Sequence, residues 1–121
     1  MPLILLVEDN EMNRDMLSRR LSRKGFEVVM AFDGIECMQV LSTQNPDLVL
    51  MDINLPGKDG YELTREIRAN PDTANLPVIA LTAHAMSGDR EKSIAAGCDD
   101  YDTKPVDFKR LLGKIQDLME N

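Results

Sequence analysis

The chain has 121 residues, of which 43% are hydrophobic, and a formal net charge of −7 at pH 7. A chain of this length folds as one domain and can bury a core without disulfides or a structural metal. The acidic balance argues against a nucleic-acid partner, because that affinity comes from clustered Lys and Arg. The first apolar run, 3–7, is too short for a signal peptide or a membrane span, so we expect a cytoplasmic protein.

The cysteines give no sign of a metal or redox site. Cys37 and Cys98 lie far apart, no CxxC occurs, and the chain has a single His. We therefore expect two reduced, half-buried thiols.

Short apolar runs alternate with polar segments of helical spacing, which is a β/α pattern. The runs are 3–7, 27–31, 48–51 and 78–81, and the more polar segment 100–103 takes the fifth strand position. Each gap between strands is long enough for a helical crossover, which favours a parallel sheet with helices on both faces. The expected fold class is α/β: a doubly wound, flavodoxin-like (βα)5 arrangement with strand order 2-1-3-4-5.

The helix boundaries follow from capping signals. The first helix begins after Asn10 and ends at Gly25. We expect four of its apolar side chains to face inward: Met12, Met16, Leu17 and Leu21. The second and third helices each begin with Asp three residues before Glu, at Asp33 and at Asp59. Met38, in the second helix, is expected in the core.

The last two helices differ in the strength of their signals. The fourth is expected from about Ser87 to Ala96, ending at Gly97. The fifth is capped by Asp107 and carries a regular apolar stripe. The stripe consists of Phe108, Leu111, Leu112, Ile115, Leu118 and Met119.

Polar residues follow four of the five strands. Glu8 and Asp9 follow the first strand, Asp52 the third, Thr82 the fourth and Lys104 the fifth. In open parallel sheets ligands bind outside the carboxyl ends of the strands, near the reversal of strand order, here between the first and third strands. We therefore expect these side chains to share one site.

Three carboxylates at one sheet edge need a cation. Two unit charges about 4 Å apart repel by roughly 4 kcal/mol at an effective dielectric of 20. Oxygen ligands and few protein donors suit Mg²⁺. Glu8, Asp9 and Asp52 are the predicted ligands; the alternative is a solvated acidic rim.

Beside Mg²⁺, the Asp52 carboxylate could accept a phosphoryl group as an aspartyl phosphate. Lys104 would supply positive charge to the phosphoryl oxygens, and Thr82 would offer a hydroxyl. Each has a simpler interpretation, since Lys104 could be a surface lysine paired with an acid and Thr82 a β-branched strand residue.

Four motifs, in this order, resemble the receiver domain of bacterial two-component response regulators. They are VEDN at 7–10, LVLMDINLPGKDG at 48–60, ALTAHA at 80–85 and YDTKP at 101–105. The resemblance covers the whole chain, so we expect 1–121 to be one receiver domain. The segment AHAMSGDRE also resembles receivers of the DivK type and those of hybrid sensor kinases. The initial Met and the capped last helix favour a stand-alone protein over an excised domain.

The resemblance implies a role for each site residue. Asp52 would be the phosphoacceptor, and the Asn54 backbone carbonyl would join Glu8, Asp9 and Asp52 as a Mg²⁺ ligand. Thr82 and Tyr101 would form the switch pair: the hydroxyl moves toward the phosphoryl group and the aromatic ring turns inward. Glu8 stands where Asp is common in the family.

The resemblance also implies partners and local geometry. The phosphodonor would be a histidine kinase, a phosphotransfer protein or a small phosphodonor. A protein target would be regulated through the fourth helix, fifth strand and fifth helix; from charge and hydropathy we expect no nucleic-acid and no membrane partner. We expect a monomer that forms at most a weak, phosphorylation-dependent dimer. Lys104-Pro105 would be a cis peptide, and we interpret His84 as an exposed loop histidine.

Three other classes stay open at this point. A phosphatase that forms an aspartyl phosphate usually has a second Asp, where this chain has Asn54, and a cap domain that this length excludes. A phosphate-independent binding module would bind its partner equally with and without a phosphoryl mimic. A flavin-binding module of the same strand order is disfavoured by the small number of aromatic residues. A receiver assists its own phosphorylation and dephosphorylation and is not an enzyme in the usual sense.

Overall fold

The computed structural model describes residues 2–83 and 88–120 and contains five strands that alternate with five helices. The strands are β1 Leu3–Val7, β2 Glu27–Ala31, β3 Leu48–Asp52, β4 Val78–Thr82 and β5 Asp100–Thr103. The helices are α1 Glu11–Arg23, α2 Gly34–Thr43, α3 Gly60–Ala69, α4 Asp89–Ala96 and α5 Phe108–Glu120. The predicted alternation of elements is confirmed.

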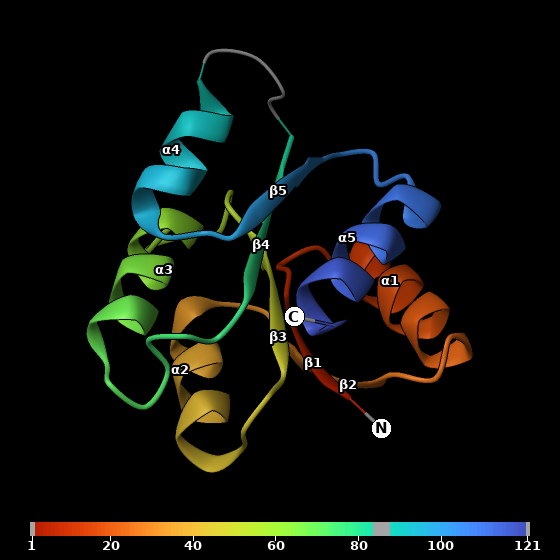
Figure 1. The fold of residues 1–121 in the computed structure, drawn as a ribbon, viewed down its shortest axis with the longest axis horizontal. Helices are drawn as coiled ribbons and strands as arrows, with labels where there is room; N and C mark the ends of the chain where they lie inside the picture. The colour runs from red at the N-terminus through yellow and green to blue at the C-terminus, as the bar shows by residue number, and fades with distance from the viewer. Residues whose placement is uncertain (1, 84–87, 121) are drawn as a thin grey trace.

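All strand pairs are parallel, in the order β2-β1-β3-β4-β5. Helices α1 and α5 cover one face of the sheet, and α2, α3 and α4 lie on the other (Figure 1). The predicted doubly wound, flavodoxin-like fold class is therefore confirmed. Because β1 and β3 are neighbours, their carboxyl ends lie side by side.

The sheet separates two apolar clusters, because successive side chains of a strand point to opposite faces. Leu5 and Val49 pack with Leu63 and Ile67 of α3. On the opposite face, the strand residues pack against the predicted stripe of α5 and against α1. That stripe consists of Phe108, Leu111, Leu112, Ile115, Leu118 and Met119, all confirmed in this cluster. Because both faces of the sheet are packed against helices, the ends of the strands, which carry the polar residues, are held in fixed positions.

The capping predictions hold with one difference. The side chains of Asn10, Asp33 and Asp59 each accept a hydrogen bond from a backbone N–H in the first turn of the helix that follows. Glu36, however, accepts a hydrogen bond at 3.1 Å from the N–H of Phe32, the residue before the cap, instead of from Asp33 itself.

Two methionine predictions are wrong. Met12 is 81% exposed and Met16 38% exposed, whereas Leu17 and Leu21 are buried. An α-helix turns by about 100° per residue, so Met16 is rotated about 100° from Leu17 around the helix axis. Met12 is rotated about 140° from Leu17. Neither methionine therefore lies on the buried face of α1. Met38 is partly buried against the core, as predicted.

Strand β5 forms despite its polar sequence because it pairs with β4 through the backbone, from Ile79↔Asp100 to Thr82↔Thr103. The Lys104-Pro105 peptide is cis, as expected. The predictions for His84 and for a start of α4 at Ser87 fall outside the described residues. Within the described part of the chain, no helix has both the length and the apolarity needed to cross a membrane.

Both cysteines are free thiols, as predicted, but they are buried instead of half-buried. Cys37 belongs to α2 and Cys98 follows α4, and both lie in the apolar cluster that contains Leu63 of α3. Burial, with the charge of Glu66 adding to it, raises the pKa of Cys37 to about 12. Burial also raises the pKa of Cys98, against the hydrogen bond with Thr64, which lowers it.

We expect both thiols to be inert in the folded protein. At about pH 8 the raised pKa leaves almost no thiolate, and the thiolate is the reactive form. A colorimetric disulfide reagent should label two thiols at once in concentrated guanidinium chloride and neither at a comparable rate in buffer. Cys37→Ala leaves one thiol as a stoichiometric control, and fast labelling of the native protein would contradict this burial.

Candidate functional site

The polar side chains predicted at the strand ends come together because the sheet is parallel. Glu8 and Asp9 follow β1, and Asp52 ends the neighbouring strand β3. Thr82 ends β4, and its carbonyl accepts a hydrogen bond at 2.8 Å from the N–H of Lys104, which follows β5. Strands separated by helical crossovers thus present one set of side chains at one edge of the sheet.

Three carboxylates form an acidic pocket. Glu8, Asp9 and Asp52 each offer an oxygen, and these oxygens all lie within 4.8 Å of one another. Glu8 is 0% exposed and Asp52 1%, while Asp9 is exposed. Glu8 is buried because the chain continues along the sheet after β1, where its N–H donates to the carbonyl of Ala31 at 3.0 Å.

The Lys104 ammonium bridges the two buried carboxylates. Its Nζ lies 2.8 Å from Glu8 Oε1 and 3.2 Å from Asp52 Oδ2. Burial lowers the pKa of Lys104, but the hydrogen bond to Glu8 and the charges of both acids outweigh burial and raise that pKa overall. Lys104 is therefore a fixed cation at this site and not a solvated surface lysine.

The remaining charge is unbalanced. Burial, followed by the hydrogen bond with Asp52, raises the pKa of Glu8 to about 7, although Lys104 and the N–H of Asn10 lower it. When all three carboxylates are ionised, the single Lys104 ammonium leaves two negative charges. Hard oxygen donors with this net charge fit a divalent cation such as Mg²⁺. The donor chemistry of Glu8, Asp9 and Asp52 thus passes the test for the predicted metal.

The other predicted site residues lie nearby in different settings. The N–H of Asn54 donates to Asp52 Oδ1 at 3.0 Å, which fixes the loop after β3 against the carboxylate. Thr82 is 1% exposed, and its neighbour Leu81 pairs with Asp52 in the sheet. Tyr101, within β5, is only partly buried and packs at the margin of the core.

Sequence reasoning missed Arg14. Its guanidinium donates to the carbonyls of Glu8 at 2.9 Å and Asp9 at 3.3 Å, and it also lies over the ring of Phe32. Arg14 thereby ties α1 to the backbone that carries two acids of the pocket. Its place four residues after the cap Asn10 was the available signal, because the first turns of α1 flank the pocket.

Sequence reasoning also missed how closely Gly60 approaches the site. A Cβ at Gly60 would lie 2.6 Å from the backbone oxygen of Asp52 and 2.8 Å from Ile53 Cα. Its N–H donates to the carbonyl of Ile53 at 3.1 Å. The start of α3 can therefore pack behind Asp52 only with glycine at this position.

Comparisons with known proteins agree with this geometry. The family model of the response regulator receiver domain matches residues 4–116. The polar-differentiation response regulator DivK of Brucella ovis is 35% identical over 113 residues, which cover 93% of this chain and 92% of DivK. The chain therefore belongs to the response regulator receiver domain family.

Solved structures of receiver domains match closely. The receiver domain of the sensor histidine kinase PA1611 from Pseudomonas aeruginosa is 41% identical, with a TM-score of 0.92 over 99% of this chain and 98% of that one, and has magnesium in its active-site cleft. The response regulator TrrA of Thermotoga maritima, in complex with Mg²⁺ and BeF, is 33% identical, with a TM-score of 0.87 over 98% and 99% of the two chains.

Family and geometry together define the class of protein. The chain is a phosphoacceptor domain of two-component signalling and not a conventional enzyme. Glu8, Asp9 and Asp52 form an acidic pocket of the kind that binds Mg²⁺. The class of phosphodonor for such a domain is the histidine kinase.

The raised pKa of Glu8, about 7, predicts that protons compete with Mg²⁺. Below pH 7 the ion must displace a proton from Glu8, so the apparent affinity should fall by about tenfold per pH unit and level off above pH 7. Calorimetric titration with Mg²⁺ in two buffers of different ionisation enthalpy should show about one proton released at low pH and almost none well above pH 7.

Glu8→Gln is the control, because its amide carries no titrating proton. The variant should bind Mg²⁺ more weakly but lose the proton release. Equal proton release from the variant and the wild type would show that another group titrates.

Gly60→Ala should destabilise the protein by about 1–3 kcal/mol, because the new Cβ forces the backbone of Asp52 or Ile53 to move. Gly113→Ala is the matched control, because a Cβ on this α5 glycine meets nothing within 4 Å. The control should be neutral or stabilise by about 0.5–1 kcal/mol. Denaturant unfolding measures both variants, and equal stabilities would refute the close approach.

Proposed function

We propose that Asp52 is the residue that accepts the phosphoryl group. The observation that carries this proposal is the bridge from Lys104 to two buried carboxylates, Glu8 and Asp52, beside exposed Asp9. Only Asp52 ends a central strand with a side chain fixed by Lys104 and by the N–H of Asn54. Asp9 is open to solvent, and Glu8 is held by Lys104 and the N–H of Asn10.

The transfer forms one bond and breaks one. A carboxylate oxygen of Asp52 attacks phosphorus, the bond from phosphorus to the donor's leaving atom breaks with its electron pair, and an acyl phosphate results. The leaving atom is a nitrogen for phosphohistidine and an oxygen for acetyl phosphate. Lys104 would exchange its contact with Asp52 for a phosphoryl oxygen, which places fixed positive charge where negative charge arrives.

The pocket would hold Mg²⁺ through Glu8, Asp9 and Asp52, with the carbonyl of Asn54 as a further ligand. When bound, the ion supplies positive charge that offsets the phosphoryl oxygens. The support is the oxygen-only donor set, and two similar receivers contain magnesium.

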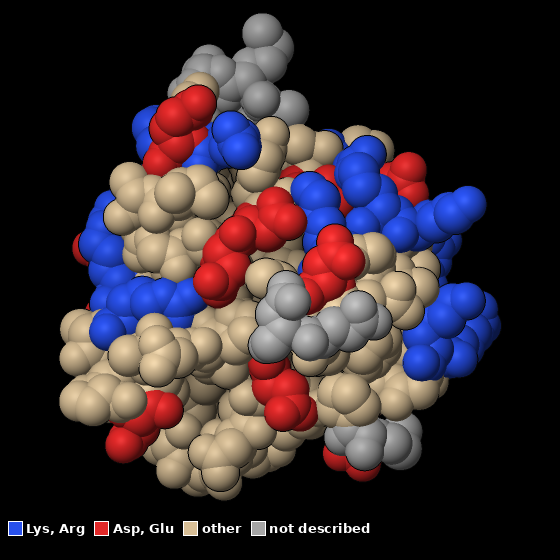
Figure 2. Space-filling model, in the orientation of Figure 1, with Lys and Arg blue, Asp and Glu red and all other residues tan. Residues whose placement is uncertain are grey.

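Thr82 and Tyr101 would report the phosphorylated state. Thr82 ends the strand beside Asp52, and Tyr101 lies on the next strand in register with Ala80. Phosphorylation would stabilise one of two arrangements of this pair in proportion to its contacts in each. The signal would leave through α4, β5 and α5, where acidic and basic side chains lie next to one another on the face shown in Figure 2.

The phosphodonor would be a histidine kinase or a phosphotransfer protein, and the target another protein. Similarity to DivK supports a stand-alone regulator over residues 1–121. Similarity to the receiver of a sensor histidine kinase supports the alternative, a receiver domain that is part of a hybrid kinase. We propose a monomer with at most weak dimerisation on phosphorylation. Two free thiols support a reducing compartment such as the cytoplasm.

The test is the intact mass after incubation with acetyl phosphate or phosphoramidate. We expect one added phosphoryl group with Mg²⁺, none with EDTA and none in Asp52→Asn. Asp15→Asn is the matched control, because Asp15 is an exposed carboxylate of α1 outside the pocket, and it should be labelled like the wild type.

Unchanged stoichiometry in Asp52→Asn would refute Asp52 as the acceptor. Absence of labelling by small donors and by a phosphorylated histidine kinase would favour the phosphate-independent binding module.

A further inference from the structure

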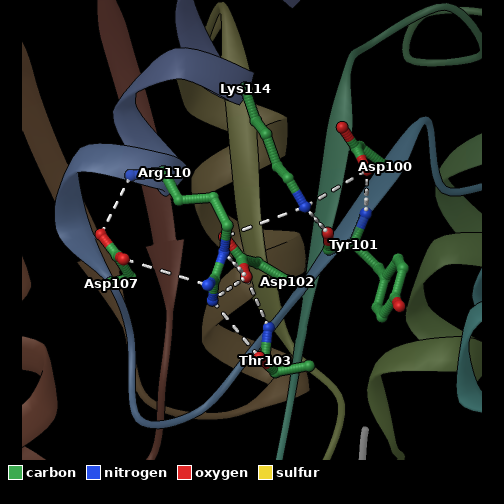
Figure 3. Close-up of polar contacts among 7 residues, drawn as sticks. All are labelled: Asp100, Tyr101, Asp102, Thr103, Asp107, Arg110 and Lys114. Carbon is green, nitrogen blue, oxygen red and sulfur yellow. Dashed lines mark hydrogen bonds and ion pairs between the residues drawn. The ribbon is translucent and has the colours of Figure 1, made fainter.

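The outer edge of β5 is closed by side chains. This strand pairs with β4 on one side, and an unpaired strand edge normally exposes backbone N–H and C=O groups. Here Asp100 Oδ1 accepts from the N–H of Tyr101 at 2.7 Å, and Asp102 Oδ1 accepts from the N–H of Thr103 at 2.8 Å. The carbonyl of Tyr101 accepts a hydrogen bond from Lys114 of α5 (Figure 3).

Lys114 contacts Tyr101 in two ways. Besides its hydrogen bond to the Tyr101 carbonyl, its Nζ lies 5.4 Å from the centre of the Tyr101 ring, within the range of a cation–π interaction. One ammonium therefore holds both the backbone and the ring of the aromatic residue proposed as the switch.

Two carboxylates keep Lys114 in this place. Its Nζ lies 3.8 Å from Asp100 Oδ1 and 3.9 Å from Asp102 Oδ2. Asp102 is 2% exposed; its Oδ1 is bound by Arg110, whereas its Oδ2 accepts no hydrogen bond from the described residues. The Oδ2 of Asp102 therefore attracts the Lys114 ammonium by charge and keeps it near the ring of Tyr101.

We propose that Lys114 is a positioning residue for the switch, one that holds the Tyr101 ring in the partly exposed arrangement seen in this structure. The inference rests on the proposed function, in which the ring turns inward on phosphorylation. Lys114 reaches Tyr101 from the outer edge of β5, whereas Thr82 lies on β4, on the other side of that strand, so a turn toward Thr82 would take the ring away from Lys114. A contact made in only one of two arrangements shifts the equilibrium toward that arrangement. Lys114 therefore opposes activation.

The test compares Lys114→Met with the wild type. The variant keeps an apolar stem and removes the charge, so it should bind beryllofluoride with Mg²⁺ about two- to fivefold more tightly, as expected for loss of one exposed cation–π contact. Tyr61 and Tyr101 are the two tyrosines, so fluorotyrosine labelling gives two ¹⁹F signals, which Tyr61→Phe assigns. Without beryllofluoride, the Tyr101 signal of Lys114→Met should lie partway toward its beryllofluoride-bound position.

Two control variants separate positioning from stability. Lys114→Arg keeps the cation and should restore wild-type affinity and signal position. Arg110→Met removes a cation of the same helix that also binds Asp102, with no ring contact to Tyr101. It should lower the unfolding midpoint without moving the Tyr101 signal toward the bound position. Lys114→Gln replaces Lys114→Met if thermal melting shows the latter to be unfolded, with the same expected shift.

The outcomes distinguish this inference from the proposed function. If wild-type protein binds beryllofluoride through Asp52 but Lys114→Met binds no more tightly, or changes only as Arg110→Met does, the role of Lys114 is refuted and the phosphoacceptor stands. If the Tyr101 signal does not move when beryllofluoride binds the wild type, the role of Lys114 is likewise refuted. If the wild type binds beryllofluoride no better than Asp52→Asn, the proposed function fails, and this inference fails with it.

Discussion

The bridge from Lys104 to Glu8 and Asp52 is the interaction on which the rest of the site depends. The two acids follow strands that are neighbours only because the sheet has the order 2-1-3-4-5, and Lys104 reaches them from the loop after the edge strand β5. One ammonium thus joins acids that lie 52 and 96 positions before it in the chain. It reduces the repulsion between buried carboxylates but leaves negative charge for a divalent cation to offset.

Burying the carboxylates of Glu8 and Asp52 is unfavourable, and a well-packed apolar core compensates for it. The strand residues of β1, β3 and β4 are almost entirely buried between two layers of helices, and this apolar core holds the strand ends in register. Burial of Ile4 and Leu50 stabilises the fold. The same burial raises the pKa of Glu8, which directly follows β1. The packed core and the electrostatically unfavourable pocket therefore have one cause, which is that the carboxyl ends of the strands are buried.

Strand β5 departs from the apolar pattern expected of a strand in this sheet. Its sequence, Asp100 to Thr103, carries two acids where a core strand would carry apolar residues. Their carboxylates close the strand edge and bind Arg110 and Lys114 of α5, so α5 is joined to β5 by charge as well as by packing. These charged side chains lie beside Tyr101, on the face where we place the output of the protein.

The sequence by itself determined the alternation of strands and helices, the caps at Asn10 and Asp59, and the set of acids at the strand ends. These features are local: periodicity, capping residues and strand ends are each read within a few positions. Only the tertiary structure decided that Cys37 is fully buried and that Lys114 lies over Tyr101. How deeply a side chain is buried, and which side chain it contacts, depend on elements distant in the chain. A helical pattern predicts the face on which a side chain lies, but the neighbouring layer decides what covers that face.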